Sequence, residues 1–292
     1  MREWRFMRLL PALLLALGVA FAPPAFAQGK AGAPKAGAAE ARSGDSRQAA
    51  LLQRQISALA PQTKGVTDIY TIGIAGWTQD VFRNELAGAL RITGKALPLN
   101  GGTVRLINSR ETADTVPLAS LQNFAAAVRA VARVMDKEED VLFLFMTSHG
   151  EKRSFGLQLP SAIVRLRPSE VAAVLNREGI KNRVVIVSAC YSGIFVKPLA
   201  NANSIVLTAA DEKSTSFGCA EGREWTYFGD ALFQHSLKPG TDFRAAFAKA
   251  LGLIAEWEKR DRFASSNPQG HFGEALVRKL APLVKATGRA DK

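Results

Sequence analysis

The chain has 292 residues, of which 47% are hydrophobic, and a formal net charge of +12. After the N-terminal region is set aside, this length and apolar content are enough for one domain with a sizeable core, and no internal repeat is apparent. The lysines and arginines are scattered, without a long basic run or interleaved aromatic residues. The charge therefore favours a solvated basic surface over a nucleic-acid-binding site, and no nucleic-acid partner is expected.

The first 27 residues have the pattern of a secretory signal peptide. Three arginines lie within the first eight residues, an apolar run covers residues 9–21, and the small residues up to Ala27 form an A-x-A cleavage site. We expect cleavage after Ala27 and an exported protein, most simply a periplasmic one. No stable membrane anchor is expected, because the apolar run is too short to span a bilayer comfortably.

The next segment, residues 28–62, begins with Ala, Gly, Lys and Ser and has almost no bulky apolar residue over its first 22 positions. This composition predicts a disordered, low-complexity segment. The remaining residues, 63–292, are expected to form one domain.

Strand and helix patterns alternate through that domain. In chain order we expect a strand at 68–75, a helix at 79–92, a strand at 104–107, a helix at 118–135, a strand leading to His149, a hairpin around 155–160, a helix at 169–176, a strand leading to Cys190, a strand at 204–209, a short helix at 227–233 and a long helix at 241–258. Strands that alternate with helices predict an α/β domain with a mainly parallel sheet.

Two of these strands end at reactive side chains. The run VLFLFMTSHG ends at His149-Gly150, and the run VVIVSACYSG carries Cys190 just after its apolar part. Both runs are short, unbroken and apolar, as expected of strands buried on both faces of a parallel sheet. Because chemistry collects at the carboxyl ends of such strands, adjacent strands would bring imidazole and thiol together. This arrangement predicts a cysteine peptidase.

Acyl transfer also needs N–H donors for the developing oxyanion, and a residue without a Cβ lets the substrate carbonyl approach closely. We therefore predict that the backbone amides of Gly150 and Cys190 form the oxyanion hole. The alternative is that Gly150 and Gly193 only end their strands.

The only other cysteine, Cys219, raises a second hypothesis for Cys190. In an oxidising compartment two cysteines often form a disulfide. The position of Cys190 directly after a buried strand favours a nucleophile, since one disulfide would add little to a domain of this size. A reversible redox lock would reconcile the two.

Three ordered patches together resemble a known family. Ser148-His149-Gly150 and Ala189 to Gly193 follow buried strands, and residues 209–219 are followed by Thr226-Tyr227-Phe228-Gly229-Asp230. These patches are similar to those of the caspase-like cysteine peptidases and, within them, of the legumain-type peptidase C13 family, here as an exported bacterial member. The resemblance runs from about Ile69 to Gly273. It implies a caspase-like three-layer sandwich with a roughly six-stranded, mainly parallel sheet and helices on both faces.

Carried over by position, the resemblance implies His149 as the base and Cys190 as the nucleophile. It implies that Ser216 and Asp230, with Ser188, line the pocket for the residue before the scissile bond, where legumains prefer asparagine. Asp230 suits an amide side chain, and it also suits Lys or Arg.

The sequence also departs from the family pattern. Ser188 stands where legumains have an acidic residue, Ser148 stands where the residue before the histidine is usually Asp, and residues 75–78 lack the usual Arg-His pair. These departures bear on specificity more than on catalysis.

The expected function is that of an endopeptidase that cleaves peptide or protein substrates, after Asn or Asp, through a thioester on Cys190. Two alternatives remain open: a transpeptidase or transamidase with the same residues, and a non-catalytic binding module with a Cys190–Cys219 disulfide. No metal or organic cofactor is expected, because the cysteines and histidines lack ligand spacing.

Overall fold

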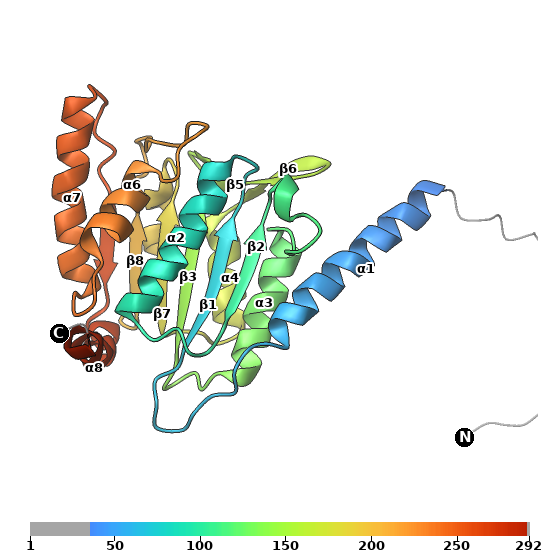
Figure 1. Ribbon diagram of the computed structural model, residues 1–292, viewed down its shortest axis with the longest axis horizontal. Helices are drawn as coiled ribbons and strands as arrows, with labels where there is room; N and C mark the ends of the chain where they lie inside the picture. The colour runs from blue at the N-terminus through green and yellow to red at the C-terminus, as the bar shows by residue number, and fades with distance from the viewer. Residues whose placement is uncertain (1–35, 291–292) are drawn as a thin grey trace, which may run out of the picture. The chain divides into compact units, whose positions relative to one another are not determined.

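The computed structural model describes residues 36–290, with side chains from residue 46 onward. Its centre is a six-stranded sheet in the order β2-β1-β3-β7-β8-β9 (Figure 1). The strands are β1 (Ile69–Ala75), β2 (Thr103–Ile107), β3 (Val141–Thr147), β7 (Arg183–Ser188), β8 (Ser204–Thr208) and β9 (Gln269–Phe272). All neighbours are parallel except β8 and β9. The strands β1, β3, β7 and β8 are buried along their whole length, as in a sheet covered on both faces.

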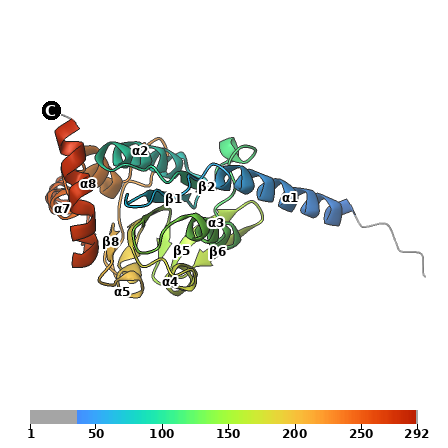
Figure 2. The ribbon, with the colours of Figure 1, turned by 90° about the horizontal axis from the view of Figure 1, so that it is seen from below.

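Helices cover both faces of the sheet, and Figure 2 shows α2 on one side and α3, α4 and α5 on the other. The first face carries α2 (Asp80–Ala96), α6 (Tyr227–Gly229), the π-helical segment η3 (Asp230–Ser236), α7 (Phe243–Arg260) and α8 (Glu274–Ala290). The second carries α3 (Leu121–Val134), α4 (Pro168–Arg177) and α5 (Val196–Leu199). Alternate strand residues enter the two cores: Phe143 and Phe145 face one, whereas Leu142 and Leu144 face the other. The predicted α/β class, with a six-stranded, mainly parallel sheet between helical layers, is confirmed.

A small second sheet follows β3 directly. Its strands are β4 (Gly150–Glu151), β5 (Ser154–Leu159) and β6 (Ala162–Leu166), paired antiparallel in that order. The hairpin expected around 155–160 is therefore present and extends to 166. The short helical turns η1 (Arg110–Thr112) and η2 (Ser192–Phe195) complete the loops after β2 and β7.

The N-terminal part of the described chain differs from the expectation of disorder over residues 28–62. Helix α1 covers Ala36–Ile56, and the compact unit that holds the sheet begins at Ala41. The reason is a short apolar stripe: Leu51 and Leu52 are buried, and Leu52 packs into the core on the α3 side. Residues 28–35 and the expected signal peptide lie outside the described residues.

Two C-terminal elements were not expected from the sequence. Strand β9 adds to the sheet edge, and α8 buries Leu276, Leu280 and Val284, which are spaced four residues apart on one face. Within residues 36–290, the helices are too short or too polar to qualify as membrane spans.

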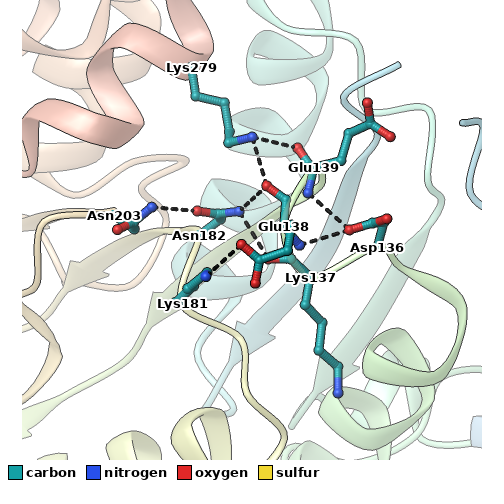
Figure 3. A network of polar contacts seen from close by, with 8 residues as sticks. All are labelled: Asp136, Lys137, Glu138, Glu139, Lys181, Asn182, Asn203 and Lys279. Carbon is teal, nitrogen blue, oxygen red and sulfur yellow. Dashed lines mark hydrogen bonds and ion pairs between the residues drawn. The ribbon is translucent and has the colours of Figure 1, made fainter. Parts of the chain in front are cut away.

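A polar network lies at the end of the sheet where the central strands β3 and β7 begin (Figure 3). Lys279 of α8 donates to the carbonyls of Glu138 and Glu139 at 2.9 and 3.0 Å. Asn182 donates to the Glu138 carbonyl at 3.1 Å, and Asp136 accepts from the amides of Glu138 and Glu139 at 2.8 and 3.1 Å. These contacts tie the loop before β3 to α8 and to the start of β7. His149 and Cys190 lie at the opposite end of the sheet, just after the carboxyl ends of β3 and β7.

Candidate active site

The register of the sheet places His149 and Cys190 at neighbouring positions. Strands β3 and β7 are parallel neighbours, with Thr147 paired to Ser188. The Ser148 amide continues the ladder by donating to the Ser188 carbonyl at 3.2 Å. His149 and Cys190 each stand two residues past that last pair, so the chain delivers both to the same edge of the sheet.

The backbones of the two segments touch at Gly150. A methyl carbon on Gly150 would lie 2.9 Å from the carbonyl carbon and 3.1 Å from the amide nitrogen of Cys190. The bond from the Gly156 amide to the His149 carbonyl makes Gly150 and Phe155 a non-hydrogen-bonded pair of the β4–β5 ladder. The Gly150 amide is therefore outside the ladder and directed away from β5.

The turn that carries Cys190 is locked to the loop after β8. Tyr191 has φ 56°, a left-handed conformation that is uncommon for a residue with a side chain, and its amide donates to the Ser214 carbonyl at 2.9 Å. Ser192 Oγ accepts from the Ala210 amide at 3.2 Å. Gly193 packs so closely on this loop that a Cβ would lie 2.6 Å from a carbonyl carbon. The turn is therefore fixed on both sides of Tyr191.

Ser216 is the partner of the Cys190 thiol. Its amide lies 3.3 Å and its hydroxyl 3.7 Å from Sγ, and the thiol in turn reaches the Ser216 carbonyl at 3.5 Å. The two donors are suited to a thiolate and the carbonyl to a thiol, so the surroundings accommodate both protonation states. Both Cys190 and Cys219 are free thiols, so the structure lacks the disulfide considered from the sequence.

The imidazole of His149 is half-buried and fixed by three residues. The rings of Trp77 and Phe82 contact it edge-on, with centroids at 5.0 and 5.1 Å, and Gln79 Oε1 bonds to its Nε2. The other end of the Gln79 amide donates to the Cys219 carbonyl at 3.2 Å. Burial lowers the pKa of His149 below its usual range, which favours the neutral, basic form.

The orientation of the Gln79 amide determines the tautomer of His149. Because the amide nitrogen is held by a carbonyl, the amide oxygen must face the imidazole. An oxygen only accepts, so Nε2 carries the proton and Nδ1 keeps the free lone pair. Sequence reasoning missed Gln79. It lies in the loop between β1 and α2, and functional residues collect in the loops that follow parallel strands.

A buried carboxyl lies beneath the two strand ends. Glu85 of α2 is fully buried and accepts hydrogen bonds from the hydroxyls of Thr147, Ser188 and Thr226, the last two at 3.2 and 2.6 Å. Burial raises the pKa of Glu85 to about 7, although the hydroxyls act in the opposite direction. Ser188, predicted to line the substrate pocket, is thus a buried partner of Glu85.

Asp230 contacts a histidine of its own helical segment, η3. Its carboxylate lies 3.4 Å from Nε2 of His235, whose ring contacts Trp257 edge-on at 5.6 Å. Among residues 46–290, no hydrogen bond or ion pair joins Asp230 to Cys190, Ser216 or His149. The structure therefore brings Gly150 and Ser216 to Cys190, sets Ser188 beneath this group, and pairs Asp230 elsewhere.

Metal-ligating residues are not clustered in the part of the chain that the structure describes: no group of three or more His, Cys, Asp or Glu side chains there is placed to hold a metal ion.

One family model and two solved structures are similar to this chain. Two solved structures are similar: caspase-1 from Spodoptera frugiperda (11% identity, 73% of this chain and 92% of that chain, TM-score 0.47) and pro-sf-caspase-1 (10% identity, 72% and 92%, TM-score 0.48). No curated protein matches the sequence. The model of the peptidase C13 family matches residues 117–271, which is more than half of the chain and includes His149, Cys190 and Ser216. The chain therefore belongs to the peptidase C13 family and is a cysteine peptidase.

Proposed function

We propose that the protein is an endopeptidase in which Cys190 is the nucleophile and His149 the general base. The observation that supports this most is the strand register: the pairing of Thr147 with Ser188 delivers the imidazole and the thiol to one edge of the sheet. A thiol needs such a base, because only its thiolate is a strong nucleophile.

In the proposed reaction, Nδ1 of His149 takes the proton of the Cys190 thiol as Sγ attacks the carbonyl carbon. The C–S bond forms, the carbonyl oxygen becomes an oxyanion, and its collapse breaks the C–N bond. The imidazolium then gives its proton to the leaving amine. In the second half, His149 takes a proton from water, which attacks the thioester. The C–S bond breaks, and the imidazolium returns the proton to sulfur.

The oxyanion is held by the amides of Gly150 and Cys190 in this proposal. Two features support it: the Gly150 amide is outside the β4–β5 ladder, and the Gly150 backbone lies against the Cys190 peptide. Backbone donors fixed by packing are suited to this task, because they need no reorganisation as charge develops.

We propose that cleavage follows Asn or Asp, as the resemblance to legumains implies. Ser216 at Cys190 offers a hydroxyl to such a side chain. The proposal retains an exported location, which rests on the signal-peptide pattern of residues 1–27.

The test is to incubate the purified protein, under reducing conditions, with a denatured protein mixture and to sequence the new termini. We expect internal cuts after Asn or Asp that disappear in Cys190→Ala and in His149→Ala. Cys219→Ala is the matched thiol control and retains the cuts. Cleavage that survives in Cys190→Ala would reject the assignment, and cuts after Lys or Arg would reject the proposed preference.

A further inference from the structure

A cavity of about 230 Å³ lies at the carboxyl ends of β1 and β2, next to the β5–β6 hairpin. Its polar lining comes from Thr78 after β1, Asn108, Ser109 and Arg110 after β2, and Gln158 on β5. Leu118 and Pro160 are among its apolar lining residues. None of these residues was assigned a role by the sequence or by the proposed reaction.

The cavity has a definite position relative to the dyad. Strands β7, β3, β1 and β2 lie side by side in that order. Along their carboxyl ends, Cys190 after β7 comes first, His149 after β3 comes next, and the ends of β1 and β2 follow. Trp77 connects the two places: its ring contacts the His149 ring at 5.0 Å, and the next residue, Thr78, lines the cavity. The cavity is thus on the His149 side of the nucleophile.

We propose that this cavity binds the part of the substrate that follows the scissile bond, and that Arg110 selects an acidic side chain there. The proposal rests on the proposed function, in which His149 protonates the leaving amine, so that the departing peptide lies on the His149 side of Cys190. An extended peptide advances about 3.3 Å per residue. The second or third residue after the bond therefore passes Trp77 and reaches Thr78 and Arg110.

Gln158 adds a hydrogen-bond donor to the cavity. Gln158 Oε1 already accepts from the hydroxyl of Thr78 at 2.7 Å, which leaves the amide N–H₂ of Gln158 to donate. The Asn108 amide, which also lines the cavity, is occupied by the carbonyls of Gly76 and Ala119 at 3.2 and 3.0 Å. The Gln158 N–H₂ and the Arg110 guanidinium are thus donors in the same cavity, and two such donors suit a carboxylate.

Arg110 gives the cavity its charge. It is exposed, it is the single charged side chain among the described lining residues, and no ion pair or side-chain hydrogen bond involves it within residues 46–290. The neighbouring Glu111 does not neutralise it, because Glu111 is paired with Arg83. An uncommitted guanidinium in a cavity is able to bind a carboxylate through two parallel hydrogen bonds.

The test uses matched peptides that share one cleavable bond and carry Asp, Asn or Lys at the second or third position after it. We expect the Asp peptide to be cleaved with a kcat/KM roughly threefold to tenfold above that of its Asn counterpart, a range set by partly exposed ion pairs. The preference falls as salt is raised. It disappears in Arg110→Gln and turns toward Lys in Arg110→Glu.

Arg133→Gln is the matched control, because Arg133 is an exposed arginine on α3 outside the cavity. This variant keeps the full preference for Asp. Cleavage of all peptides with equal kcat/KM, or a preference for Asp that persists in Arg110→Gln, overturns the inference and leaves the endopeptidase standing. The absence of any cleavage dependent on Cys190 overturns both.

Discussion

Gly150 packs directly on the peptide group of Cys190. A side chain as small as a methyl group on Gly150 would lie 2.9 Å from the carbonyl carbon of Cys190 and closer still to its oxygen. The obstructing atoms are backbone atoms, which do not rotate away as a flexible side chain would. The His149 and Cys190 segments can therefore lie this close together only because residue 150 has no Cβ.

Gly150→Ala is therefore expected to damage both stability and activity. Overpacking of this kind costs about 1–3 kcal/mol of the free energy of unfolding, and pushing the two segments apart displaces the proposed oxyanion donors. Urea unfolding and kcat/KM measure the two effects. Gly252→Ala in α7 is the control, since nothing lies near its missing Cβ. It should stabilise by about 0.5–1 kcal/mol at unchanged activity. A fully active Gly150→Ala would contradict this account.

Gln79 is expected to set the basicity of His149. In Gln79→Ala, the Nε2 proton loses its acceptor and the ring is free to change tautomer, so kcat should fall roughly tenfold to a hundredfold, part of the factor that a general base contributes. KM should change little. In Gln79→Glu, a carboxylate beside the ring favours the imidazolium and raises the pKa of His149. The acid limb of the pH–rate profile should therefore move to higher pH.

The pH–rate profile separates this role from a merely structural one. A loss of packing lowers the rate at every pH, whereas a charge at position 79 displaces the acid limb. Gln234→Ala, at an exposed glutamine on η3, is the control and should leave the profile unchanged. Identical acid limbs in the parent protein and in Gln79→Glu would show that Gln79 does not act on His149.

Local patterns predicted the parts of the site that lie on one chain segment. His149 and Cys190 could be found because each ends an apolar run, and the parallel sheet follows from the alternation of strands and helices. Gln79 and Glu85 act through contacts with distant segments, 70 residues away from His149 and 103 away from Ser188. Glu85 leaves no local pattern, because it has the same spacing as any polar residue of α2, and Gln79 is marked only by its place in the loop after a strand.

Contacts between distant segments also explain why the sequence did not reveal the helix at the start of the domain. The Ala- and Gly-rich composition of residues 28–49 hides the two leucines that anchor α1, because their burial depends on α3 and the sheet. The contact of Asp230 with His235 likewise could not be read from the sequence, because it depends on the π-helical segment that holds both residues.

The buried carboxyl of Glu85 makes the stability of the folded protein depend on pH. Thr147 and Ser188, two of its hydrogen-bond donors, stand two residues before His149 and Cys190, respectively. The carboxyl has no cationic partner among the described residues, so its charge is stabilised only by neutral hydrogen-bond donors, namely the three hydroxyls and the backbone at Thr226. Burial therefore raises its pKa from 4.5 to about 7. A carboxyl whose pKa rises on folding stabilises the folded state most when the pH is below 4.5, and this contribution is lost as the pH rises to about 7.

Glu85→Gln is expected to reduce the pH dependence of stability. The parent protein should lose about 2–3 kcal/mol of its free energy of unfolding between pH 5 and pH 8 from this carboxyl alone. The neutral amide keeps an oxygen acceptor for the hydroxyls and does not titrate, so this part of the loss should vanish in the variant. Urea unfolding at pH 5, 6, 7 and 8 measures it, with the exposed Glu224→Gln as the matched control. If Glu85→Gln and the parent lose the same free energy over this range, the buried carboxyl does not titrate near neutrality.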